Sequence, residues 1–67
     1  MTLIEIIAKN INEKRKNLSI DKISKLADIS VSTLWHIMGN QVKDVRLSTI
    51  IAIAKALNCT VDDLIKD

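Results

Sequence analysis

Several side chains that could do chemistry lie in one short stretch with the sequence ISVSTLWHIMGN. Ser30, Ser32 and Thr33 supply hydroxyl groups there, and the only tryptophan and the only histidine of the chain, Trp35 and His36, are adjacent. Hydroxyl, indole N–H and imidazole groups all form hydrogen bonds. Consecutive helical residues point about 100° apart, so a helical Trp35 and His36 can rarely both face one core. This stretch is therefore expected to present polar and aromatic groups to a partner.

The composition supplies neither an active site nor a metal site. With one histidine, one cysteine and no tyrosine, the chain cannot assemble a nucleophile, a base and a group that orients the base. Cys59 and His36 are too few ligands for zinc, and Asp62 and Asp63 are explained as caps of a short helix. We therefore expect a protein that is not an enzyme and needs no cofactor or metal.

The length and the apolar runs bound the architecture. A chain of 67 residues is expected to form one domain, residues 1–67, that buries only about 60% of its unfolded surface. The core then needs nearly every apolar residue, and no pocket for a small-molecule ligand is expected. No apolar run approaches the roughly 18 residues of a membrane span, and LIEII is too short and too charged for a signal peptide. With a single cysteine that cannot form an internal disulfide, these features predict a cytoplasmic protein without a membrane partner.

The positive charge is concentrated in the first two thirds of the chain. Residues 9–46 carry eight lysines and arginines against four acidic residues, whereas residues 47–67 carry two lysines against three aspartates. A local excess of positive charge attracts polyanions such as nucleic acids.

Capping signals and apolar spacing predict five short helices. Thr2 with Glu5 and Thr60 with Asp63 are typical of capping boxes. The expected helices span about residues 3–16, 20–27, 31–38, 46–57 and a last turn that ends at Lys66. Further N-caps and left-handed helix ends are expected at Ser19, Ser30, Asp28, Gly39-Asn40 and Asn58.

Apolar residues at helical spacing predict the inward faces. The expected core comprises Ile4, Ile7, Ala8, Ile11, Ile23, Leu26, Ala27, Leu34, Ile37, Leu47, Ile50, Ile53, Ala54, Leu57, Cys59, Val61, Leu64 and Ile65.

The second and third predicted helices are joined by only about three residues, so they should cross steeply, as in a helix-turn-helix. Five positions must be apolar to hold such a corner. The chain fills them with Ile23, Ala27, Ile29, Leu34 and Ile37.

Two segments carry a resemblance to a known family. LSIDKISKLADISVSTLWHIMGN resembles the helix-turn-helix of the Cro and lambda-repressor type, also called the XRE family, and RLSTIIAIAKALNCTVDDLI is similar to the family's fourth and fifth helices. The resemblance covers about residues 7–65. It implies an all-α, compact five-helix bundle of the lambda-repressor-like type that binds double-stranded DNA as a transcriptional regulator, with repression as the expected action.

Three positions depart from the family pattern. Ile20 stands where the family often has a phosphate-binding Gln, and Asp28 replaces the common turn Gly. Met38 stands where some relatives have a Glu that pairs with the Arg matched by Arg15. Arg15 is therefore expected to be free to meet solvent or phosphate.

With Leu34 inward, the third helix directs a defined set outward. These residues, Val31, Ser32, Trp35 and His36, are the predicted base-reading residues, because the start of a recognition helix enters the major groove. For Trp35, packing against the second helix or the 41–45 loop, or a contact with a second copy, stays open. His36 could also be merely solvated.

A second set is expected to position the protein on the DNA backbone: Ser30, Thr33, Asn40, Lys43, Arg46 and Arg15. Ser30 and Thr33 could equally serve only to cap the third helix. Lys14, Arg15 and Lys16 form a charge run, which is usually only a solvated face.

Two further expectations concern partners. One recognition helix reads too few base pairs to mark a unique site, so we expect a weak homodimer formed on DNA through Ile51, Ala52 and Ile65, unless these residues only close the core. The alternative function is a protein-interaction module, such as an antitoxin or a helical adaptor. DNA affinity that falls steeply with salt would separate the two.

Overall fold

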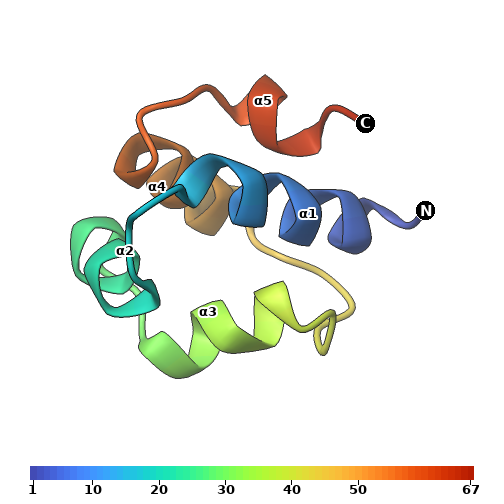
Figure 1. Ribbon diagram of the computed structural model, residues 1–67. Helices are drawn as coiled ribbons and strands as arrows, with labels where there is room; N and C mark the ends of the chain where they lie inside the picture. Colours follow the sequence, from blue (N-terminus) through green and yellow to red (C-terminus); the bar gives the residue numbers. More distant parts are fainter.

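The computed structural model describes all of residues 1–67 as five helices without strands (Figure 1). They are α1 (Leu3–Arg15), α2 (Ile20–Ala27), α3 (Val31–Met38), α4 (Leu47–Ala56) and α5 (Val61–Ile65). The predicted all-α, five-helix architecture is confirmed, and each predicted helix boundary lies within one residue of the observed one.

Side-chain hydroxyls cap four of the five helices at their N-termini. Thr2, Ser19, Ser30 and Thr60 each accept a hydrogen bond from the backbone N–H three residues later, over 3.0–3.3 Å. The Thr60 N–H also donates to the Asp63 carboxylate, and this hydrogen bond lowers the pKa of Asp63. The helix starts are therefore set by local hydrogen bonds that the sequence predicts.

Four of the five helices are followed within two residues by a residue with a positive φ angle. Asp28 adopts the left-handed conformation with φ of 56°, and Asn58 does so at the end of α4. After α3 it is Asn40 that has a positive φ, whereas Gly39 has φ of −91°. A Cβ on Gly39 would lie 3.2 Å from the Trp35 carbonyl oxygen, so tight packing rather than a left-handed backbone favours glycine there.

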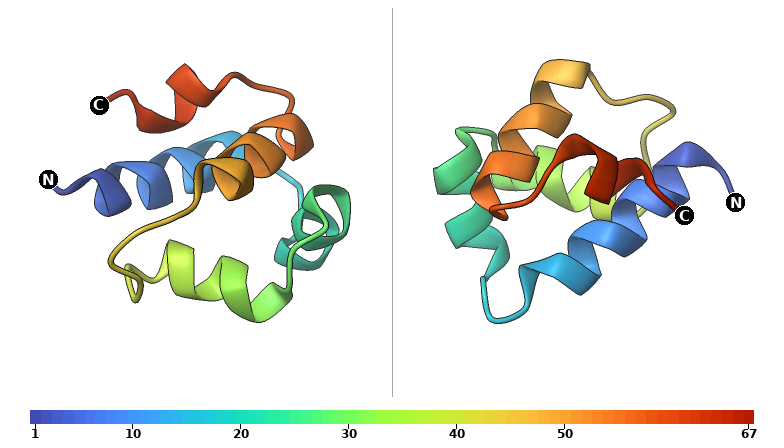
Figure 2. Two further views of the ribbon diagram at one scale, coloured as in Figure 1. Left: turned by 180° about the vertical axis from the view of Figure 1, so that it is seen from behind. Right: turned by 90° about the horizontal axis from the view of Figure 1, so that it is seen from above.

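The arrangement places α3 on one side of α1 and α5 on the other (Figures 1 and 2). The helix α2 packs on both α3 and α4, and α4 also contacts α5. Asn10 joins α1 to α5, because its buried side-chain amide donates to the Leu64 and Lys66 carbonyls, each over 2.8 Å. The helix α3 thus packs on α1 and α2 with its inner side, and its outer side is uncovered.

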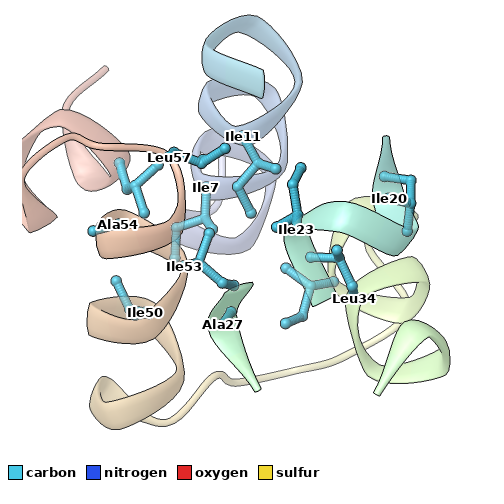
Figure 3. Close-up of a cluster of buried hydrophobic side chains, with 12 residues drawn as sticks. Ile7, Ile11, Ile20, Ile23, Ala27, Leu34, Ile50, Ile53, Ala54 and Leu57 are labelled. Atoms are coloured by element: carbon cyan, nitrogen blue, oxygen red, sulfur yellow. The ribbon is translucent and has the colours of Figure 1, made fainter. Parts of the chain in front are cut away.

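The core lies between α1, α2, α3 and α4 and includes one residue of α5 (Figure 3). All of the predicted corner residues on α2 and α3 are buried, and Ile29 packs half-buried against them. The buried apolar cluster comprises Ile7, Ile11, Ile20, Ile23, Ala27, Leu34, Ile37, Ile50, Ile53, Ala54, Leu57 and Leu64.

Three apolar residues predicted to face inward lie on the surface instead. Leu26, Leu47 and Ile65 are 53%, 64% and 39% exposed. These short helices carry more apolar residues than their buried faces can hold. Ser24 and Ile20 fill the stripe of α2 in place of Leu26. Cys59, expected to be buried, is half-buried, and its desolvation raises the pKa of the thiol.

Candidate nucleic-acid interface

The outer face of α3 carries the four residues predicted to read bases. Leu34 and Ile37 are 0% and 2% exposed and fix the rotation of the helix about its axis. At 100° per residue Ser32 then points almost directly away from the core, with Trp35 and His36 on either side of it. The exposed fractions agree, since Ser32 and His36 are exposed and Trp35 is 57% exposed. More than half of Trp35 is thus open to a ligand, and the rest is covered by the protein.

These outward residues form two rows along the helix. Residues four positions apart are neighbours on a helix surface. Val31 and Trp35 therefore form an apolar row, and Ser32 and His36 form a polar row beside it. The helix contains no Lys, Arg, Asp or Glu, so its outer face offers apolar area and short hydrogen-bonding groups rather than fixed charge.

The start of α3 is tied together by Ser30 and Thr33. The Ser30 hydroxyl accepts from the Thr33 N–H over 3.0 Å and donates to the Thr33 hydroxyl over 2.7 Å. Both residues are exposed. The Thr33 hydroxyl keeps its own proton free to donate, for instance to a phosphate oxygen, while Ser30 is occupied within the helix start.

A groove of about 400 Å³ separates the start of α3 from the start of α4. Val42 and Val45 of the 39–46 connection line it and pack against the core. Arg46 and Asp44 also line the groove, and the Asp44 carboxylate accepts from the Val45 N–H over 2.9 Å. The connection therefore holds Arg46 beside the start of α3.

The start of α4 differs from the other helix starts. Arg46 occupies its N-cap position, and no side chain accepts a hydrogen bond from the first turn of α4. Unpaired backbone N–H groups at a helix start favour anions. The sequence interpretation began this helix one residue early, at Arg46, because no Ser, Thr, Asp or Asn at that position marks the N-cap.

Asn40 and Lys43 lie at the far end of α3. Both are exposed, and together with Thr2 and Glu5 at the start of α1 they line a shallow hollow. The structure therefore places these two residues and Arg46 along the same connection: Arg46 lies beside the start of α3, and the other two lie between the end of α3 and the start of α1.

Arg15 is separated from this group and makes hydrogen bonds of its own within α1 and the turn after it. Its Nε donates to the Asn12 side chain over 3.1 Å and its Nη1 donates to the Leu18 carbonyl over 3.3 Å. These hydrogen bonds hold the half-buried guanidinium against the turn after α1. The start of α1 lies beside Asn40, so Arg15 is roughly 20 Å away along the α1 axis, at a rise of about 1.5 Å per residue.

The family comparison agrees with this geometry. A model of the Cro/C1-type HTH DNA-binding domain matches residues 6–67, whereas no curated protein and no solved structure matches the chain. None of the helices has the length and the apolar character needed to cross a membrane. The matched family is typically non-enzymatic. On its sequence match over almost the whole chain and on its five-helix fold with a helix-turn-helix at α2 and α3, the protein belongs to the Cro/C1-type HTH DNA-binding domain family.

Proposed function

We propose that the protein is a sequence-specific transcriptional regulator that represses by occupying a short operator with α3 in the major groove. The observation that carries this proposal is the outer face of α3, where Ser32, Trp35 and His36 are exposed while Leu34 and Ile37 lock the helix into the core. The whole chain, residues 1–67, acts as one DNA-binding domain. Its place of action is the cytoplasm, where a single unpaired cysteine stays reduced.

Two groups of residues have different roles on DNA. Val31, Ser32, Trp35 and His36 face the base edges. Thr33, Asn40, Lys43 and Arg46 contact the phosphates on either side, which fixes register without reading sequence. Ser30 contributes by shaping the start of α3, and Arg15, which is held at the far end of α1, contributes only to the general positive field.

The operator is occupied by a weak homodimer. One recognition helix reads only a few base pairs, and helix-turn-helix proteins commonly bind two half-sites about 34 Å apart. Ile51 and Ile65 are 37% and 39% exposed, lie outside the core cluster, and offer a small apolar patch on the α4 and α5 side. A patch of this size supports an association that tightens only when both copies are on DNA.

The test begins with selection of bound duplexes from a random pool. The Ser32→Ala, His36→Ala double variant should then lose about 1–3 kcal/mol of specific binding for each base that the two side chains pair with well. A Lys9→Ala variant, which removes an exposed charge on α1, is the control for general electrostatics. A folded double variant with unchanged affinity and unchanged sequence preference would contradict the assignment of this face.

The alternative, a protein-interaction module, is favoured by one observation. Leu47 and Ile51 are exposed and four residues apart on α4, where a helical partner could pack. Failure to select any DNA, together with binding of a protein partner that is insensitive to salt, would favour it over DNA binding.

A further inference from the structure

We propose that the apolar row of Val31 and Trp35 reads thymine methyl groups, so that the centre of each bound half-site consists of A·T base pairs and requires no guanine. This inference rests on the proposed function, because it assigns the chemistry that α3 recognises once it lies in the major groove.

The first argument is the set of side chains that α3 does not have. Long side chains give the strongest base discrimination: Arg or Lys pairs with guanine, Asn or Gln with adenine, and Asp or Glu with cytosine. None of these six residue types occurs between Val31 and Met38. The hydrogen-bonding groups that remain on the outer face, on Ser32, Trp35 and His36, are single donors or acceptors that are compatible with more than one base.

The second argument is the apolar area that α3 exposes. Val31 is 36% and Trp35 57% exposed, and at four residues apart they are neighbours on the helix surface. Leu34 and Ile37 are buried and occupy the inward side of α3, which leaves Val31 and Trp35 on its outer half. Thr33 and Ile37 face the groove beside α4, and by helical rotation the apolar row lies on the opposite flank of α3. The row is thus available to a ligand and is not covered by the 39–46 connection.

The third argument is the chemistry of the major groove. The C5-methyl of thymine is the one apolar group among the base edges there, and apolar side chains contact it. An apolar row whose single polar group is the indole N–H of Trp35 gains free energy mainly by covering these methyls. A guanine edge offers acceptors to that one donor but no apolar group to cover.

The experiment removes the methyl groups alone. A duplex selected by the full chain is resynthesised with deoxyuridine in place of thymidine at central half-site positions, which leaves base pairing unchanged. Affinity should fall about three- to fourfold for each contacted methyl, the factor that corresponds to one buried methylene-sized group. The same replacement outside the half-sites controls for altered DNA stiffness and should have no effect.

Protein variants then connect the methyl to the row. In Trp35→Ala, replacing thymidine with deoxyuridine should hardly change the affinity, because the ring that covers the methyl is gone. Leu26→Ala is the matched control. The exposed fraction of Leu26, 53%, is similar to that of Trp35, but Leu26 lies on α2, so this variant should keep the full thymidine dependence. Circular dichroism confirms that each variant is folded, as expected for such exposed positions.

The outcomes separate this inference from the function on which it rests. Selected half-sites centred on A·T pairs, with a deoxyuridine penalty that Trp35→Ala removes, support it. Half-sites that require a central guanine, or a penalty of zero, overturn it and leave DNA binding intact. Selection of no DNA at all overturns the proposed function as well.

Discussion

The two connections that flank α3 are built in different ways. The connection from α2 has three residues, Asp28 to Ser30, and each is fixed: Asp28 is left-handed, Ile29 packs on the core and Ser30 caps α3. The connection to α4, residues 39–46, is longer and is held mainly by Val42 and Val45 against the core, and it ends at an uncapped helix start. The residues that we propose to read bases thus follow the rigid connection, whereas Lys43 and Arg46, which we propose to contact phosphates, lie on the more adaptable one. This division suits DNA, because base edges demand exact register while phosphates tolerate adjustment.

The largest effect is expected from removing a buried side chain beside the connection from α2 to α3. Leu34→Ala removes a side chain that is 0% exposed, and large-to-small changes at such sites cost about 2–5 kcal/mol of unfolding free energy. Val45→Ala, on the other connection, removes a half-buried side chain and should cost clearly less. Urea denaturation of both variants measures the two losses of unfolding free energy. Equal losses would contradict the difference in rigidity between the two connections.

The next effect concerns binding through the adaptable connection. Lys43→Ala or Arg46→Ala should weaken binding to all sequences alike and reduce the slope of log affinity against log salt by about 0.9 for each phosphate that the variant no longer neutralises. Titrations at several salt concentrations, with the selected duplex and a scrambled one, give both quantities. An altered base preference with an unchanged slope would mean that these residues read bases.

A smaller effect is expected from the helix caps. Ser30→Ala removes the hydroxyl that caps α3 and should cost about 1 kcal/mol of stability. Ser48→Ala is its matched control, since Ser48 is an exposed serine in the first turn of the uncapped α4, and its loss should change stability by only a few tenths of a kcal/mol. Chemical denaturation distinguishes the two, and similar losses would show that the α4 start also depends on a hydroxyl.

The smallest effect is expected at the turn itself. Asp28→Gly relieves the left-handed strain of a non-glycine residue but adds backbone entropy to the unfolded chain, so stability should rise by at most about 0.5 kcal/mol. Asp28→Ala keeps the strain without the local hydrogen-bonding capacity of Asp and should be destabilising. A clear loss of stability in the glycine variant would show that the Asp28 carboxylate has a role of its own.

Helix boundaries were predictable from sequence because hydroxyls and left-handed residues act within one turn. The outward direction of α3 followed in the same way from the burial of Leu34 and Ile37. Leu26 and Leu47 were misplaced because apolar spacing cannot tell which member of a surplus of apolar residues reaches the core. The groove beside α4 and the hydrogen bonds of Arg15 could not be foreseen, since both depend on how non-periodic connections pack.

The solitary position of Trp35 has an optical consequence. The chain has no other tryptophan and no tyrosine or phenylalanine, so its intrinsic fluorescence arises from one indole ring on the outer face of α3. Because that ring is already 57% exposed in the folded protein, unfolding changes its surroundings little. A ligand that covers the ring changes them strongly. The emission of the unlabelled protein is thus a selective reporter of what occupies α3 and a poor reporter of whether the core is intact.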